Sequence, residues 1–156
     1  MTEQNQPIVV DQNHYHSIAK VARLRTLALV YLEHFSTYQN QRARVFEGDP
    51  LLTTAFDKDR GYADLTYAGT RIRFALIVGL SNSEPIAKVR CLHRFEVNGE
   101  SKESSLGEFL LLEGGRTNLI ERNGKPHYTE GSADLIAAYY FAKAFEKNLE
   151  GGMATS

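Results

Sequence analysis

Acidic side chains are the first residues in this sequence whose type could support catalysis. The only acidic cluster consists of Asp57, Asp59, Asp64, Glu33 and Glu47. Two-metal nucleases hold carboxylates of this kind at the end of a strand, together with a lysine. The segment Glu100-Ser101-Lys102 has matching residue types, but the sequence predicts a loop there. Because a motif outside its structural context is a poor indication of activity, we do not expect a nuclease.

Histidine and cysteine give no stronger indication of a reactive site. The segment His14-Tyr15-His16 places two histidines two residues apart, where a helix is predicted to begin. Helical metal ligands pair at a spacing of three or four residues instead. The one cysteine, Cys91, lies on the predicted buried side of a strand, and no serine occupies a Gly-x-Ser-x-Gly turn. The sequence therefore predicts no metal site, no cofactor and no catalytic residue, and we expect a protein that is not an enzyme.

Basic residues form the clearest pattern in the chain. The segments "TRIRFALIV" (70–78) and "IAKVRCLHRFEV" (86–97) both alternate between apolar and other residues. Successive side chains of a strand point to opposite faces, so both segments predict strands with one apolar and one basic face. This basic face consists of Arg71, Arg73, Lys88, Arg90 and Arg94. It is a candidate surface for an anionic ligand or a nucleic acid. Arg25, inside the apolar arc of the first predicted helix, is a further candidate for binding an anion.

The alternative interpretation is that carboxylates neutralise the basic face. Four of them lie in predicted strands, namely Asp64, Glu96, Glu108 and Glu121. The chain has 18 Lys and Arg against 19 Asp and Glu, whereas a nucleic-acid-binding domain usually carries an excess of cations. Nucleic-acid platforms also present aromatic residues, and the outward positions here carry Ala75, Ile77 and Leu92. We therefore expect a mainly salt-bridged surface, with nucleic-acid or anionic-ligand binding as the less favoured function.

Two long helices are predicted on either side of a strand-rich region. The first begins near His14, capped by Asp11 or Asn13, and ends near Gln39; the second is capped by Ser132. A short helix is predicted over 50–56, with Asp49 as its cap and Pro50 as its first residue. The predicted strands are 62–67, 70–79, 86–98, 106–113, 116–122 and 125–129.

These elements predict an α+β fold. An antiparallel meander of five or six strands is covered on one face by the long N-terminal helix and the C-terminal helix. Residues 13–150 form a single domain, residues 1–12 are disordered or add a short strand, and residues 151–156 form a disordered tail. If "PIVV" (7–10) joins the sheet, the order of elements resembles the helix-grip arrangement, in which a curved sheet wraps a long C-terminal helix around a cavity. That resemblance implies binding of an apolar ligand between sheet and helix as another alternative function.

Apolar residues outside the predicted core indicate a surface for protein association. In the second helix, the predicted core face is Leu135, Ala138, Tyr139, Phe141, Ala142, Phe145 and Leu149. Residues away from this face, together with two at the polar margin of the first helix, form the predicted partner surface: Ile136, Tyr140, Lys143, Lys147, Leu27 and Val30. The favoured function is therefore a non-enzymatic binding or accessory module that acts through protein–protein association, with a homo-oligomer as the first expectation.

The expected setting is the cytoplasm. The single cysteine suits a reducing compartment, and the first residues lack the pattern of a secretory signal. No apolar run is long enough for a membrane span, so we expect no membrane partner.

Overall fold

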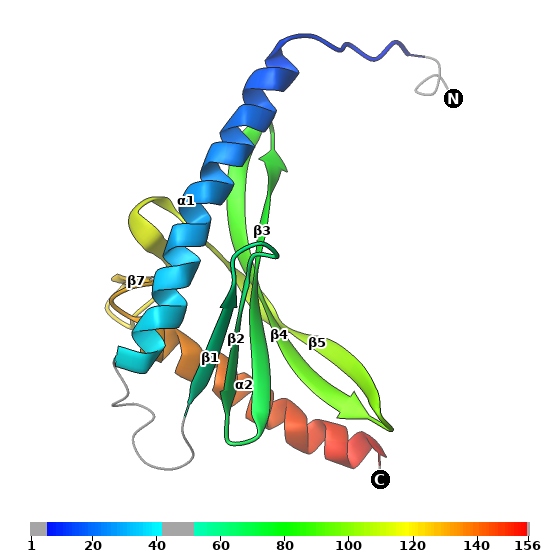
Figure 1. Cartoon of the computed structure of the whole chain (residues 1–156), viewed down its shortest axis with the longest axis vertical. Helices are drawn as coiled ribbons and strands as arrows, with labels where there is room; N and C mark the ends of the chain where they lie inside the picture. The colour runs from blue at the N-terminus through cyan, green and yellow to red at the C-terminus, as the bar shows by residue number, and fades with distance from the viewer. Residues whose placement is uncertain (1–5, 42–51, 156) are drawn as a thin grey trace.

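The computed structural model describes residues 6–41 and 52–155 of the chain (Figure 1). Its elements, in order, are α1 (Asn13–Gln41), β1 (Thr53–Asp57), β2 (Tyr62–Tyr67), β3 (Thr70–Ser81), β4 (Glu84–Val97), β5 (Glu100–Leu110), the 3₁₀ turn η3 (Glu113–Gly115), β6 (Arg116–Ile120), β7 (Pro126–Tyr128) and α2 (Ala133–Thr155). The predicted α+β class is confirmed. The C-terminal helix α2 extends past residue 150, where we expected the domain to end. Neither helix, within the described residues, is long and apolar enough to cross a membrane.

Five of the strands form one antiparallel meander in the order β1-β2-β3-β4-β5. The last two strands, β6 and β7, pair with each other as a separate two-stranded sheet, which we call the β6–β7 hairpin. A single bridge between Leu111 and Thr117 connects this hairpin to the end of β5. The β6–β7 hairpin lies beside α1 rather than extending the main sheet (Figure 1).

Strand β5 begins earlier than the sequence predicted. The predicted loop over 98–105 is wrong, because Asn98 and Gly99 alone make the turn, with φ of 53° and 81°. Two residues at positive φ form the hairpin turn whose twist matches that of the strands. Val97 therefore pairs directly with Glu100, and the segment 100–105 continues the ladder with β4.

The predicted short helix over 50–56 is wrong where the structure describes it. Residues 53–57 form β1, which pairs with β2 from Thr53 opposite Thr66 to Asp57 opposite Tyr62. Pairing at the edge of the sheet provides backbone hydrogen bonds that outweigh the weak local preference for a helix. The predicted cap Asp49 and Pro50 lie outside the described residues.

The segment before α1 does not join the sheet. Residues 7–10 form no strand, so the predicted order of elements that resembled the helix-grip arrangement is not formed. Asp11 caps α1, with its Oδ1 accepting a hydrogen bond of 2.9 Å from the Asn13 N–H. The first turns of α1 extend beyond the body of the molecule, and residues 6–12, which we call the N-terminal arm, lead away from it (Figure 1).

Both helices pack on the same face of the main sheet. The ring of Phe74 in β3 contacts Phe35 of α1 and Tyr140 of α2, with ring centroids 4.8 Å and 5.8 Å apart. The two helices also meet directly, because Gln39 Nε2 donates a hydrogen bond of 2.6 Å to the carbonyl oxygen of Ala133. The predicted cover on one face is therefore confirmed.

The face of α2 that enters the core differs from the prediction. Ile136 and Tyr140, which we expected at the surface, are each only 2% exposed, whereas Leu135 and Tyr139 are 49% and 52% exposed. The physical reason lies in the small residues of the helix. Ala133, Ala137 and Ala144 are fully buried and allow the helix backbone to approach the sheet closely.

Tyr140 fills the space between α2 and the sheet. Its ring stacks on Phe109 at 6.0 Å as well as on the edge of Phe74. Gly107 in β5 lies beneath it, and a β-carbon there would be at ordinary contact distance, 3.9 Å from the Tyr140 ring and 3.7 Å from Lys143 Nζ. The region that the helix-grip resemblance offered to an apolar ligand is thus occupied by side chains at this point.

A glycine fixes the β6–β7 hairpin against α1. Gly115 has φ of +81°, and a β-carbon there would lie 2.7 Å from Thr129 Oγ1 and 3.4 Å from the Tyr31 ring. Tyr31 also accepts a hydrogen bond of 3.0 Å at its hydroxyl from the Gly114 N–H. Only glycine suits position 115, because the backbone conformation and the close approach both exclude a side chain.

Candidate functional site

The basic face is largely neutralised by ion pairs. Arg73 makes two hydrogen bonds to the Asp64 carboxylate, from Nε to Oδ1 at 2.7 Å and from Nη2 to Oδ2 at 2.9 Å. These hydrogen bonds raise the pKa of the Arg73 guanidinium. The guanidinium also lies 3.5 Å from the centre of the Tyr62 ring. Arg73 is therefore committed to its neighbours on β2 and is not available to a ligand.

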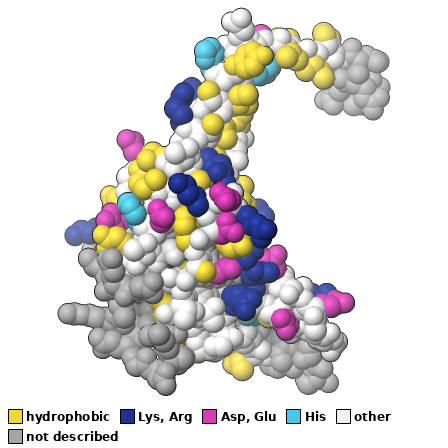
Figure 2. All heavy atoms as spheres, in the orientation of Figure 1, with side chains coloured by type: hydrophobic (Ala, Val, Ile, Leu, Met, Phe, Trp, Pro, Cys, Tyr) yellow, Lys and Arg dark blue, Asp and Glu magenta, His cyan; other side chains and the backbone are white. Residues whose placement is uncertain are grey.

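Three more cations of the basic face have acidic partners on β5. Lys88 and Arg90 share the Glu108 carboxylate, at 3.1 Å and 3.8 Å, and Arg94 lies 3.4 Å from Glu103. Figure 2 shows basic and acidic side chains interleaved over the middle of the visible face. The predicted pairing is confirmed for Asp64 and Glu108. Glu103 was missed because we placed it in a loop.

Arg71 is the cation of the basic face that makes no ion pair with any described residue. It lies opposite Arg94 on the neighbouring strand. Both line a cavity of about 190 Å³, together with Thr66 and Ser101. The Arg94 Nε atom is buried there without a hydrogen-bond partner in the described part of the chain. The part of the basic face that lines this cavity is thus Arg71 and Arg94, beside the charged residues Glu96 and Lys102, and Arg94 Nε lies 3.4 Å from the Glu103 carboxylate.

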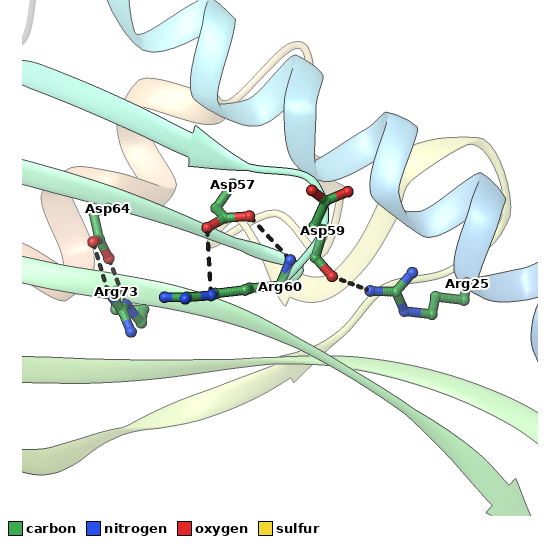
Figure 3. Close-up of polar contacts among 6 residues, drawn as sticks. All are labelled: Arg25, Asp57, Asp59, Arg60, Asp64 and Arg73. Carbon is green, nitrogen blue, oxygen red and sulfur yellow. Dashed lines mark hydrogen bonds and ion pairs between the residues drawn. The ribbon is translucent and has the colours of Figure 1, made fainter.

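The Arg25 guanidinium binds a backbone carbonyl oxygen of the β1–β2 turn. Its Nη2 donates a hydrogen bond of 3.2 Å to the carbonyl oxygen of Asp59 (Figure 3). It lies at the margin of a cavity of about 310 Å³ between α1 and the β1–β2 turn, whose other lining residues include Val30 and Phe56. The hydrogen bond of Arg25 thus connects α1 to the β1–β2 turn.

Side chains of the predicted acidic cluster stabilise a turn and form an ion pair. Asp57 Oδ1 accepts a hydrogen bond of 3.0 Å from the Arg60 N–H, and Asp64 is bound to Arg73 (Figure 3). Glu47, which we included in the cluster, lies outside the described residues. Within residues 6–41 and 52–155 no group of three His, Cys, Asp or Glu residues is arranged to hold a metal ion.

The titratable groups of the core are held neutral by burial. Desolvation raises the pKa of the Cys91 thiol well above its ordinary value, and Tyr140 donates a hydrogen bond to its sulfur. The pKa of the Tyr140 hydroxyl is raised as well, again mainly by burial. Burial lowers the pKa of His93, and the nearby charge of Lys147 lowers it further. A protonated, buried thiol is a poor nucleophile.

Exposed apolar residues gather at the N-terminal end of the molecule. In the N-terminal arm, Ile8, Val9 and Val10 are 88%, 75% and 79% exposed. Tyr15 and Ile18, on the first turns of α1, are 72% and 60% exposed. Figure 2 shows hydrophobic side chains along this end of the molecule. We did not predict this exposed surface, because we assigned residues 7–10 to disorder or to a strand. The sequence feature that indicated this surface is the run of three branched apolar residues, Ile8, Val9 and Val10.

The predicted partner surface is only partly present. Leu27 and Val30 are exposed on α1, as expected, and Lys143 and Lys147 are partly exposed on α2. Ile136 and Tyr140 are buried in the core, so their assignment to this surface is wrong. The surface therefore keeps its residues on α1 and loses the two apolar residues on α2.

A second apolar feature lies between the β6–β7 hairpin and α2. This hairpin cavity, of about 250 Å³, is lined by Leu119, Ile120, His127, Leu135, Ile136 and Tyr139. The Nδ1 atom of His127 is buried without a hydrogen-bond partner among the described residues. This atom has essentially no accessible surface, so the cavity offers an occupant mainly its apolar walls.

Comparison of the chain with models of known protein families, with curated proteins and with solved structures finds no match.

Proposed function

We propose that this protein is a non-catalytic binding module that acts through protein–protein association, with self-association as its first mode. The observation that carries the proposal is the exposed apolar surface formed by Ile8, Val9, Val10, Tyr15 and Ile18. Single exposed apolar residues are normal, but a large apolar patch usually marks an interaction site, and here five large apolar side chains are exposed within residues 8–18. Leu27 and Val30 add exposed apolar area further along the same helix.

The energetics favour a dimer with two equivalent contacts. Burying one large apolar side chain contributes about 1.5–3 kcal/mol, so five partly exposed ones contribute at most roughly 5–10 kcal/mol. The loss of translational and rotational freedom on association costs on the order of 4–15 kcal/mol. One such contact is therefore marginal. A two-fold symmetric dimer contains this contact twice, but it loses translational and rotational freedom only once. A symmetric dimer is therefore favourable.

Sedimentation at micromolar concentration tests the proposal. We expect a concentration-dependent dimer, and we expect the combined substitutions Ile8→Asp and Val10→Asp to yield a monomer with an unchanged circular dichroism spectrum. The combined substitutions Gln6→Asp and Gln12→Asp are the matched control, because they add the same two charges to exposed residues of the same arm. A wild-type chain that stays monomeric throughout, and binds no protein, would contradict the proposal.

Binding of a small anion is the second candidate function. Its support is the facing pair Arg71 and Arg94, which line one cavity, where Arg71 makes no ion pair with any described residue. Phosphate or pyrophosphate should bind in a calorimetric titration, and Arg71→Ala should abolish the binding, whereas Arg90→Ala, outside this cavity, should not. Two phosphate contacts on a single-stranded nucleic acid would give a salt slope of only about −1.4. A much steeper slope would indicate a larger nucleic-acid surface than this cavity provides.

A further inference from the structure

We propose that the N-terminal arm of one copy inserts into the hairpin cavity of a second copy, with the two α1 helices antiparallel. The inference rests on the proposed self-association and specifies its contact. Each copy gives its arm and receives the partner's arm, so the dimer is closed and has two identical contacts.

Distance excludes the same contact within one chain. The cavity lies near the C-terminal end of α1, where Gln39 bonds to Ala133 at the start of α2. From Asn13 to Gln39, α1 is about 39 Å long at a rise of 1.5 Å per residue. The five residues from Ile8 to Asn13 span at most about 17 Å. The arm therefore cannot reach its own cavity, but antiparallel helices bring each arm beside the partner's hairpin.

The chemistry of the arm fits the cavity. Alternate residues of an extended segment share a side, so Ile8 and Val10 can enter the cavity together while Val9 faces outward. In the free chain the Val9 carbonyl oxygen lies 3.2 Å from His14 Nε2. Insertion thus buries the apolar side chains of Ile8 and Val10 against the apolar walls of the cavity.

The exposed side of α1 supports an antiparallel pair. Leu27 lies at the midpoint of the helix, which runs from residue 13 to residue 41, and Val30 is exposed one turn later. With the two-fold axis between them, Leu27 of one copy faces Val30 of the other. Arg23 then faces His34 and lies next to Glu33 of the second copy. This places opposite charges together at the edge of an apolar centre.

Disulfide trapping between differently labelled copies tests the contact. One preparation carries Val10→Cys and the other Ile120→Cys, at the rim of the cavity; Cys91 stays because burial keeps it unreactive. Added diamide takes two electrons and two protons from each thiol pair. We expect several-fold more mixed disulfide for Val10→Cys with Ile120→Cys than for Val10→Cys with Glu100→Cys, an exposed control on β5.

The outcomes separate this inference from the proposed function. A dimer by sedimentation that gives no Val10–Ile120 crosslink would overturn arm insertion and leave self-association intact. Strong Val10–Val10 crosslinking would also overturn it, because the two arms lie at opposite ends of an antiparallel pair. A chain that is monomeric under every condition would contradict both the arm insertion and the proposed self-association. Ile8→Asp should abolish the crosslink, whereas Gln12→Asp should preserve it.

Discussion

Two adjacent tyrosines of α2 test which face of this helix enters the core. Tyr140 is 2% exposed and Tyr139 is 52% exposed. We compare Tyr140→Ala with Tyr139→Ala. Both substitutions exchange the same side chains in the same helix, so the change in helix propensity is the same and cancels in the difference.

The expected magnitudes follow from what each ring contacts. Removing Tyr140 leaves a cavity between Phe74 and Phe109 and deletes the hydrogen bond to Cys91. Deleting a buried aromatic side chain costs about 3–5 kcal/mol. The substitution Tyr139→Ala removes a side chain that is about half buried and its exposed contact with Lys143, which together contribute about 1–1.5 kcal/mol. The expected difference is about 2–4 kcal/mol, or roughly 5–15 °C in the melting temperature of a domain of this size.

Urea denaturation followed by circular dichroism measures both free energies of unfolding. It should be repeated at two protein concentrations, because association stabilises the folded state by mass action and Tyr139 lines the proposed contact. Equal losses for the two variants, or a larger loss for Tyr139→Ala, would refute the burial described here and restore the face predicted from the sequence.

Three further predictions concern the sheet, the core and the hairpin. Arg73→Ala should cost about 1.5–3 kcal/mol and exposed Lys88→Ala at most about 1 kcal/mol, measured by denaturation. Because burial lowers the pKa of His93, its contribution to stability is complete above about pH 6.5 and declines as the pH falls below that value; His93→Gln should flatten this dependence in thermal melts. Gly115→Ala should destabilise the fold more than Gly114→Ala, since both have positive φ but only Gly115 approaches another side chain closely.

The alternation of side chains was sufficient to predict the central strands. Strand β2 has the predicted limits, and β3 and β4 lie within two residues of theirs, because one buried face fixes the register of a strand. The limits of β5 were missed, since residues 100–105 are polar and take their conformation from pairing with β4. A polar strand at the edge of a sheet carries no alternating pattern.

The candidate site was harder to predict than the fold. Periodicity shows how wide the apolar face of a helix is, but its rotation against the sheet depends on where close contact is possible. In α2 that contact is made by alanines and by Tyr140 opposite Gly107, a fit that involves residues far apart in the sequence. The hairpin cavity depends in the same way on a β6–β7 hairpin held by Gly115, Thr129 and α1.

Salt concentration separates the two candidate functions. Insertion of the arm is driven by apolar burial, which sulfate strengthens, and its charged contact between Arg23 and Glu33 is exposed and worth at most about 1 kcal/mol. Anion binding by Arg71 and Arg94 depends on charge, whose range falls from about 10 Å to about 3 Å between 0.1 M and 1 M salt. We therefore expect the dimer to persist or tighten in sodium sulfate, as measured by sedimentation, while phosphate binding weakens in sodium chloride. A dimer that dissociates in high sulfate would show that charge, and not the exposed apolar arm, holds the two copies together.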